Sequence, residues 1–359
     1  MDFAFYGAPA DSCIGDFADR LGQALSARGH QQTSAQPGTK LVFSHVDREK
    51  PRPFRRHAQA TYIIALLRMP EEPSDFLLAA YPYLVRSLAN LLLAVVGDPQ
   101  HPRTYFLTLE RGWYPIRAAF FAPEHAEEIA DRLTPLATSQ LIVDNIFDAD
   151  LEEVLWGGDA ATVQLRRAGE TLDAWNLLPA PFPIQEMLPP EDFRHLQHLY
   201  QLGGLSYGNL SQRRDQKRFW MSGSGVNKAR LEEVGRDILM VKDYDDGQRA
   251  MRLSVPPQVR PRRVSVDAIE HHMIYREHPQ VGAIIHVHAW MDGIASTEVN
   301  YPCGTLQLAT SVAALVSEAE NPAQAVIGLK NHGMTITGHD LDDIMERVDG
   351  KIIPQVPMS

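Results

Sequence analysis

The chain has few of the features that would assign it to a class at once. Only two of its 359 residues are cysteines, Cys13 and Cys303, and they lie far apart. No disulfide framework is expected, and a reducing cytoplasm fits this usage. The N-terminus has no basic segment followed by a long apolar one, so no signal peptide is predicted. The most apolar stretch, Leu91–Val96, is far too short to span a bilayer.

Positive charge is also in short supply. The chain carries 34 basic and 45 acidic residues, for a formal net charge of -11. This balance argues against binding to nucleic acid or to an anionic membrane, so neither partner is expected. A phosphate or carboxylate substrate would need a local positive site, such as a metal ion or a helix N-terminus. With 44% hydrophobic and 22% charged residues, the composition is that of a soluble globular protein, and the length predicts two domains.

The first half has no glycine-rich phosphate loop, no nucleophile elbow and no metal-ligand spacing. Its pattern alternates between strands and helices, which predicts a separate α/β or α+β domain over residues 1–176. Its role is open: regulation, capping of a substrate, or oligomerisation. Prolines at 179, 181, 183, 189 and 190 predict a linker over 177–190. The expected strands are Phe3–Tyr6, Leu41–Phe43, Tyr62–Leu67, Tyr105–Leu109 and Leu141–Val143. One helix is expected to begin near Asp16, and three more are expected over Leu77–Val96, Pro123–Leu136 and Asp148–Trp156.

The stretch Ala283–Trp290 carries the clearest chemical signal of the second half. Ala283–Ile285 is apolar, as in a buried strand, and His286 and His288 follow two residues apart. Side chains alternate along a strand, so both imidazoles should point the same way. A divalent metal would satisfy both rings, although ordinary hydrogen bonds would do so as well.

Further polar groups lie where predicted elements end. The strand Ala325–Leu329 runs into Lys330–Gly333, which places His332 at a glycine turn as a candidate third ligand. A helix over Ser265–Tyr275 is expected, with Ser265 as its N-cap and Asp267 in its first turn. Upstream, Gly203–Ser211 is rich in glycine, and Ser222–Gly225 can form an anion-binding nest of backbone N–H groups.

The order of these pieces resembles the class II aldolase and adducin family. The pieces are Gly-Asn-x-Ser at 208–211, Ser-Gly-Ser-Gly at 222–225, an aspartate four residues before His271, His-x-His at 286–288 and Asn-His-Gly at 331–333. The resemblance covers about Glu191–Ile352, so we expect a metal-binding domain of this family over 191–359. It implies an α/β/α sandwich around a mostly antiparallel sheet, and a homo-oligomer, either a dimer or a tetramer.

The resemblance also assigns roles to single residues. His286, His288 and His332 would be the metal ligands, with zinc the expected ion and Fe²⁺ or Mn²⁺ as alternatives. Asp267 stands at the position of the family's catalytic acid/base. A further set falls on positions that hold the substrate phosphate in the sugar-phosphate enzymes: Asn209, Ser224, Gly225 and Ser265. Val266 departs from the second serine that those enzymes carry, which weakens the expectation of a phosphate.

Three functions are compatible with this site. The first is a cytoplasmic, metal-dependent lyase for a small hydroxy-carbonyl or sugar-phosphate substrate, which acts by retro-aldol cleavage, epimerisation or dehydration through a metal-stabilised enediolate. The second is a non-haem Fe(II) oxygenase on the same fold. The third is a non-catalytic scaffold with a structural metal. For that case His271, His272 and His339 are candidates for a fourth ligand, and helix capping is the structural alternative for Asp267.

Overall fold

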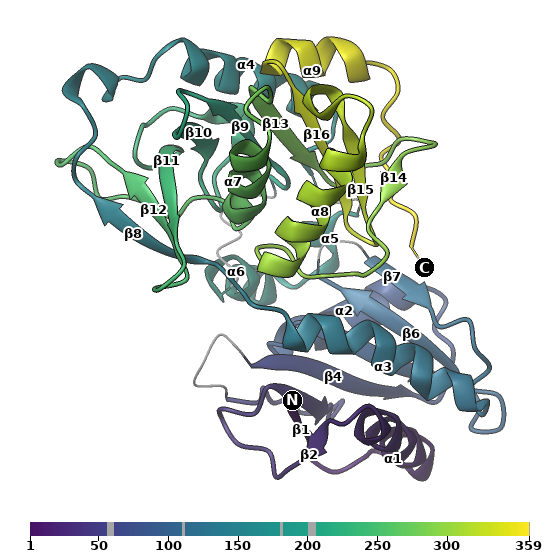
Figure 1. Ribbon diagram of the computed structural model, residues 1–359. Coiled ribbons are helices and arrows are strands. Elements are labelled where there is room, and N and C mark those ends of the chain that lie inside the picture. Colours follow the sequence, from purple (N-terminus) through teal and green to yellow (C-terminus); the bar gives the residue numbers. More distant parts are fainter. Residues whose placement is uncertain (56–60, 110–111, 180–181, 200–205, 359) are drawn as a thin grey trace. The chain divides into compact units, whose positions relative to one another are not determined.

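The structure is a computed structural model that describes residues 1–55, 61–109, 112–179, 182–199 and 206–358 (Figure 1). Residues 203–205 of the glycine-rich stretch and 180–181 of the predicted linker lie outside the described residues. The chain divides into two compact units. Unit 1 comprises Met1–Thr138 and Pro181–Tyr200, and unit 2 comprises Ser139–Ala180 and Gln201–Ser359.

Unit 1 is built on a seven-stranded sheet with the strand order β2-β1-β3-β4-β5-β6-β7. Strands β1 to β5 pair in parallel, and β6 and β7 add two antiparallel strands at one edge. Helix α1 packs against α3, and α2 packs against α5 and α6. The strands are β1 (Asp2–Tyr6), β2 (Gln31–Gln32), β3 (Leu41–His45), β4 (Tyr62–Met69), β5 (Leu91–Val96), β6 (Arg103–Thr108) and β7 (Gly112–Pro115), and the helices are α1 (Ser12–Ala27), α2 (Phe76–Arg86), α3 (Pro123–Thr138), α5 (Ile184–Met187) and α6 (Pro190–Leu199).

The predicted single helix over Leu77–Val96 is wrong in its second half. Helix α2 ends at Arg86, Leu88 has a φ of 50°, and Leu91–Val96 is a fully buried strand. A short, continuous apolar run fits a buried helix and a buried strand equally well. The parallel partner β4 decides the outcome, and it lies outside the window in which periodicity is read.

Unit 2 is built on a nine-stranded sheet with the strand order β14-β15-β16-β13-β9-β10-β11-β12-β8. Most neighbouring strands are antiparallel, and β12 with β8 and β14 with β15 are the parallel pairs. The strands are β8 (Asp144–Asp148), β9 (Asn209–Arg213), β10 (Phe219–Ser222), β11 (Ile238–Asp245), β12 (Ala250–Ser254), β13 (Ala283–Val287), β14 (Ala295–Ser296), β15 (Val326–Leu329) and β16 (Gly333–Gly338), and the helices are η1 (Glu153–Leu155), α4 (Ala160–Ala174), η2 (Lys228–Arg230), α7 (Ala268–Glu277), α8 (Leu306–Glu318), η3 (Pro322–Gln324) and α9 (Leu341–Val348).

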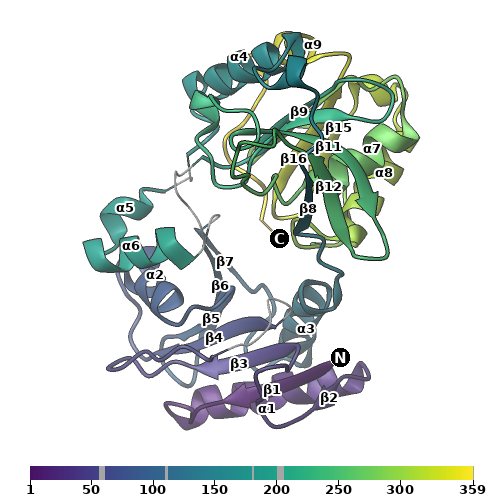
Figure 2. The same ribbon diagram turned by 90° about the vertical axis from the view of Figure 1, so that its left-hand side faces the viewer.

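Helices cover both faces of this second sheet. Alternation along β10 sends Phe219 and Met221 into one core, which α7 and α8 close, and Trp220 into the other, which α4 and α9 close. The paired helices lie side by side in both views (Figure 1; Figure 2). In the described part of the chain, no helix has the length and apolar character that a bilayer span requires.

The division of the chain differs from the predicted boundaries at 176 and 191. Strand β8 pairs with β12, and α4 packs against β9, so residues 139–180 belong to unit 2. Helix α6 instead packs against α2 in unit 1. The predicted strand Leu141–Val143 and the predicted helix Asp148–Trp156 are replaced by β8 and η1. Sheet pairing across about 100 residues of chain sets this division, and local composition does not reveal it.

Asp11 has two roles in unit 1. Its Oδ1 accepts a hydrogen bond from the Ile14 N–H at 3.0 Å and caps α1, while Oδ2 accepts from Nε of Arg68 at 2.8 Å. Arg68 is only 2% exposed, and its remaining nitrogens donate to the carbonyls of Val95 and Gly97. Loss of Asp11 would therefore remove a cap and also the counter-ion of a buried guanidinium.

We expect Asp11→Ala to lower the free energy of unfolding by about 2–4 kcal/mol, because the lost cap costs about 1 kcal/mol and the unpaired buried charge adds to it. Asp75→Ala is the matched control, because Asp75 caps α2 in the same way through the Leu78 N–H at 2.9 Å. Urea denaturation measures both variants. Equal losses would contradict a contribution from the ion pair.

Candidate metal centre

The site is organised around a row of three side chains on neighbouring strands. In the antiparallel register, His286 of β13 lies opposite Asn209 of β9 on one side and Thr335 of β16 on the other. Directly opposed residues of antiparallel strands project from the same face of the sheet. All three side chains are buried, and helix α7 packs on this face. The row therefore places an imidazole between an amide and a hydroxyl beneath one helix.

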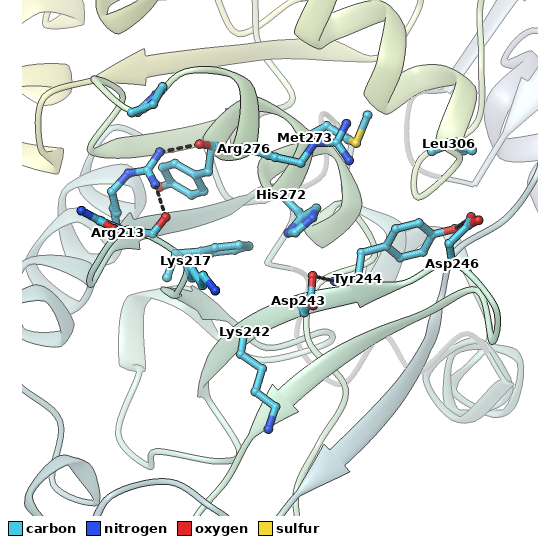
Figure 3. A pocket seen from close by; sticks show the side chains of 14 residues that line it. Arg213, Lys217, Lys242, Asp243, Tyr244, Asp246, His272, Met273, Arg276 and Leu306 are labelled. Atoms are coloured by element: carbon cyan, nitrogen blue, oxygen red, sulfur yellow. Dashed lines mark hydrogen bonds between the residues drawn. The ribbon is translucent and has the colours of Figure 1, made fainter.

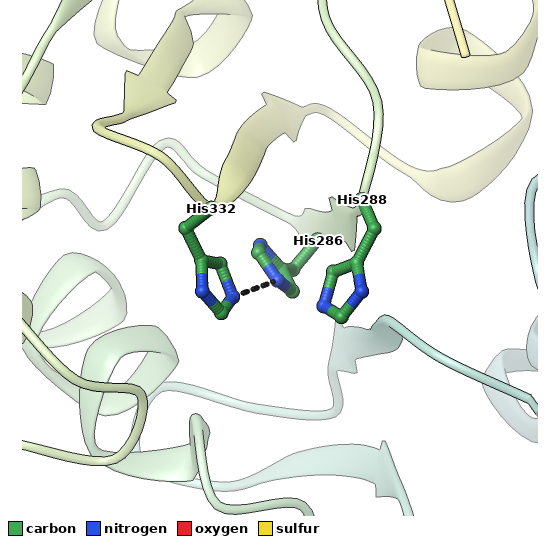
Figure 4. A group of neighbouring side chains, drawn as sticks. All are labelled: His286, His288 and His332. Atoms are coloured by element: carbon green, nitrogen blue, oxygen red, sulfur yellow. Dashed lines mark hydrogen bonds between the residues drawn. The ribbon is translucent and has the colours of Figure 1, made fainter. Parts of the chain in front are cut away.

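His286, the middle member of this row, comes together with His288 and His332. Their ligand nitrogens all lie within 4.8 Å of one another, and the Nε2 atoms of His286 and His332 are 3.1 Å apart. The ring centroid of His288 lies 5.3 Å from that of His286 and 5.0 Å from that of His332. Figure 4 shows the three rings converging from separate backbone positions. Residues 46 positions apart in sequence thus form one cluster.

The local sequence explains why His332 reaches the other two rings. Asn331 adopts a φ of 56°, a left-handed conformation that asparagine tolerates better than most residues. Gly333 then lies directly against β13, where a Cβ atom would be 2.3 Å from the carbonyl oxygen of Val287. Only glycine permits this approach, which holds the turn next to His288.

Asp267 is buried beside the row and does not cap its helix. Helix α7 begins at Ala268, and the Asp267 side chain makes no capping hydrogen bond to it. Oδ2 of Asp267 instead accepts from Nδ2 of Asn209 at 2.7 Å. The N-cap position is Asp267, so the predicted N-cap at Ser265 is wrong by two residues. The Ser265 carbonyl accepts the Ala268 N–H in a turn before the helix.

Glu270 is a second buried acid that sequence reasoning missed. It lies one helical turn after Asp267, is 2% exposed, and its Oε1 accepts from Oγ1 of Thr335 at 2.5 Å. Thr335 Oγ1 also lies 3.5 Å from Nδ1 of His286. With the Thr335 hydroxyl donating to Glu270, its oxygen can accept a hydrogen bond from the ring N–H of His286. That tautomer has the lone pair of His286 on Nε2, the nitrogen that faces His332.

In many metal sites a carboxyl group orients the imidazole that binds the metal. Here Glu270 would orient His286 through the hydroxyl of Thr335. The signal for Glu270 was present in the sequence as an acid within the otherwise apolar start of α7. Its partner Thr335 could be found only from the register between β13 and β16.

The predicted substrate residues fall into two groups. Asn209 belongs to the row described above. Ser224, Gly225 and Ser265 lie together in a separate loop pair that a bridge between Gly223 and Val264 holds. The Ser224 N–H donates to the Arg263 carbonyl at 2.8 Å, and Gly225 has a φ of 67°. The structure thus brings the two serine segments side by side, as an anion-binding loop would need.

The three histidines considered as a fourth ligand have other positions. His271 is fully buried and its Nδ1 bonds to Oγ of Ser211 at 2.7 Å. Burial, followed by the nearby His286, lowers the pKa of His271 well below its usual value. His272 lines a separate cavity, and His339 is exposed. A different residue, Cys303, has its Sγ 3.1 Å from Nε2 of His332.

A cavity of about 1000 Å³ lies elsewhere in unit 2 and is not lined by the histidine cluster (Figure 3). Two of its basic side chains already have partners. Lys242 pairs with Asp148 and Asp150 at 2.8 and 2.5 Å, and Arg213 donates to the carbonyls of Tyr275 and His278. The size of this cavity alone therefore does not identify it as the active site of unit 2.

The histidine cluster fits a divalent cation. Two imidazole nitrogens on one tetrahedral zinc ion are separated by roughly 3.3 Å, given Zn–N bonds of about 2.05 Å. The observed 3.1 Å between Nε2 of His286 and Nε2 of His332 is close to this separation. Three neutral imidazoles are a donor set that zinc and similar transition metals prefer.

Comparison with known families places part of unit 2 in one family. The family model of the class II aldolase and adducin N-terminal domain matches residues 193–298. This segment belongs to the class II aldolase and adducin family. The match includes Asn209, Asp267, His286 and His288, and it ends before His332.

The curated relatives are methylthioribulose-1-phosphate dehydratases. The protein of Xanthomonas campestris pv. campestris (strain B100) is 35% identical over 88 residues, which are 24% of this chain and 35% of the relative. That of Stenotrophomonas maltophilia (strain K279a) is 28% identical over 143 residues, 39% of this chain and 61% of the relative. The chain thus spans about a third of the length of the first of these relatives.

Solved structures give a weaker likeness. YgbL from Klebsiella pneumoniae has a TM-score of 0.36 at 16% identity, and the match covers 53% of this chain and 83% of that one. An L-fuculose 1-phosphate aldolase has the same TM-score and identity, over 53% and 82%.

Glu270 gives a prediction for stability. Burial, with the negative charge of Asp267 adding to it, raises the pKa of Glu270 to about 8. The unfolded value is about 4.3, so between these values the folded state holds a proton that the unfolded state releases. The free energy of unfolding therefore falls as the pH rises. From about pH 6.5 to about pH 8, above the titration of unfolded histidines, we expect a fall on the order of 1–2 kcal/mol.

Urea denaturation of the metal-free protein at several pH values measures this fall. Glu270→Gln keeps the shape of the side chain and removes its titration, so the free energy of unfolding of this variant should change less over the same range. Parallel curves for wild type and variant would contradict the assignment.

Proposed function

We propose that unit 2 is a metal-dependent lyase for a small hydroxy-carbonyl or sugar-phosphate compound, built on the α/β/α sandwich of the class II aldolases. The observation that carries this proposal is the convergence of His286, His288 and His332 beside a buried carboxylate. The likeness to dehydratases of 28–35% identity supports the lyase class.

The three imidazoles would hold a divalent cation, with zinc as the expected ion. Such a cation supplies Lewis-acid chemistry: it polarises a carbonyl and stabilises the negative charge that develops when an adjacent bond breaks. Three protein ligands leave a position for substrate, as catalytic zinc sites require.

Asp267 would transfer the proton. Its Oδ2 accepts from Nδ2 of Asn209, which fixes that oxygen, and Asn209 lies opposite His286 in the sheet. Asp267 is thereby held on the face of the sheet from which the His286 side chain projects. A carboxylate in a buried setting is a suitable base for a carbon-bound proton, and in its protonated form it can deliver that proton to a leaving hydroxyl.

The substrate class follows from two features. Ser224, Gly225 and Ser265 form a loop pair that would accept a phosphate through the two serine hydroxyls and the Gly225 N–H. The N–H groups of Ser224 and Ser265 already donate to backbone carbonyls. The relatives are named for a sugar phosphate, methylthioribulose 1-phosphate, and for its dehydration. We therefore propose dehydration of a ketose 1-phosphate as the first reaction to test and retro-aldol cleavage as the second.

Metal binding tests the donor set. We expect wild type to retain one zinc ion per chain after dialysis, and His288→Ala to bind zinc more than about 100-fold more weakly, since loss of a ligand costs more than loss of an outer partner. His288 is half-buried, so its removal disturbs the core less than that of His286. His339→Ala, at an exposed histidine, is the control and should bind as wild type does. Full retention by His288→Ala would overturn the site.

The reaction itself tests Asp267. In zinc-loaded protein, Asp267→Asn should lower kcat for the accepted ketose 1-phosphate by about 10²- to 10⁴-fold, which is the contribution of a positioned acid/base. Zinc content should remain that of wild type, because Asp267 is not a ligand. Chromatography of the products distinguishes the two reactions: dehydration gives a single product that has lost water, and cleavage gives an aldehyde and a second fragment. Wild-type kcat in Asp267→Asn would remove Asp267 from the mechanism.

A further inference from the structure

Tyr207 stacks on one of the proposed metal ligands. Its ring centroid lies 5.4 Å from that of His288, and the two ring planes are inclined by only 28°. This separation and angle are those of offset-stacked rings. Tyr207 is 6% exposed, whereas His288 is half-buried. The Tyr207 N–H donates to the carbonyl of the buried Leu178 at 2.7 Å, which fixes the backbone that carries the ring. One face of the His288 imidazole is therefore covered by an anchored aromatic ring.

The register of the sheet explains this contact. Asn209 of β9 lies opposite His286 of β13 in an antiparallel pair. Two residues further on, Tyr207 and His288 are the next opposed residues that project from the same face. Gly208 lies between Tyr207 and Asn209 with a φ of 71°, and a Cβ atom there would be 2.4 Å from the carbonyl oxygen of His286. The glycine therefore lets the chain run close enough to β13 for the two rings to meet.

His288 lies just past the paired part of its strand. The pairing of β13 with β16 ends at Val287, whereas His286 has paired neighbours on both sides. The last side-chain torsion of a histidine has a broad range, and a turn about it moves both ring nitrogens. A flat ring packed against the imidazole narrows this range. We propose that Tyr207 is a positioning residue that holds the His288 ring at the angle at which it binds the cation. This inference rests on the proposed three-histidine metal site.

Stacking also favours the metal-bound state of the imidazole. A ring nitrogen that donates its lone pair to a divalent cation draws electron density out of the ring. The face of a phenol ring carries negative potential, so it attracts an electron-poor ring more strongly than a neutral one. Phenylalanine presents a similar face, and an aliphatic side chain presents none. The ring face of Tyr207, and not its hydroxyl, should therefore strengthen metal binding.

Titration of the metal-free protein with Co²⁺ measures the effect without any activity. Visible absorption reports the bound ion, and competition with a chelator of known affinity gives the Kd. We expect Tyr207→Leu to bind Co²⁺ about tenfold more weakly than wild type, as is typical when a group that orients a ligand is lost. Tyr207→Phe should bind within about twofold of wild type, because it keeps the ring face. Tyr244→Leu is the matched control and should bind as wild type does, because the ring of Tyr244 lies beside His272, which is outside the histidine cluster.

The outcomes separate this inference from the proposed metal site. Equal Co²⁺ affinity in wild type and Tyr207→Leu overturns the positioning role and leaves the three-histidine site intact. A loss as large in Tyr207→Phe as in Tyr207→Leu assigns the effect to the hydroxyl and overturns the role of the ring face. Absence of Co²⁺ binding in wild type overturns the metal site and this inference together. Urea denaturation of the metal-free variants shows whether each is folded, and Tyr207→Met, which also lacks a ring, replaces Tyr207→Leu if that variant does not fold.

Discussion

The row of Asn209, His286 and Thr335 across three antiparallel strands is the constraint on which the rest of the site depends. The start of α7 supplies two acids above this row. Asp267, just before the helix, accepts from the Asn209 amide, and Glu270, in its first turn, accepts from the Thr335 hydroxyl. The register of the sheet therefore sets both the orientation of the central imidazole and the position of the proposed acid/base. A shift of one residue in that register would turn His286 to the opposite face.

Short motifs were enough to find the centre of the site. Two histidines at a spacing of two predicted a shared direction, and the glycine after His332 predicted a turn. The turn brings that ring within reach of the other two. These features are local, because strand alternation and left-handed turn positions are properties of adjacent residues. Helix α7 was likewise predicted from local signals, although its start was placed two residues too early.

What sequence reasoning missed was set by contacts between distant segments. The pairing of β8 with β12 assigns residues 139–180 to unit 2, and the parallel partner β4 makes Leu91–Val96 a strand. The hydrogen bond between Glu270 and Thr335 joins residues 65 positions apart, and the contact between Cys303 and His332 joins residues 29 positions apart. No window of helical or strand length contains both members of such a pair. The cysteine was considered only for disulfides, where its distance from Cys13 excluded a role.

The central claim is that one cation occupies the space between three imidazoles. Anomalous diffraction from crystals of the zinc-loaded protein, recorded on both sides of the zinc absorption edge, tests it most directly. The account predicts a single strong peak within bonding distance of Nε2 of His286, of a nitrogen of His288 and of Nε2 of His332. A map with no peak there, or with zinc bound only at other residues, would contradict it.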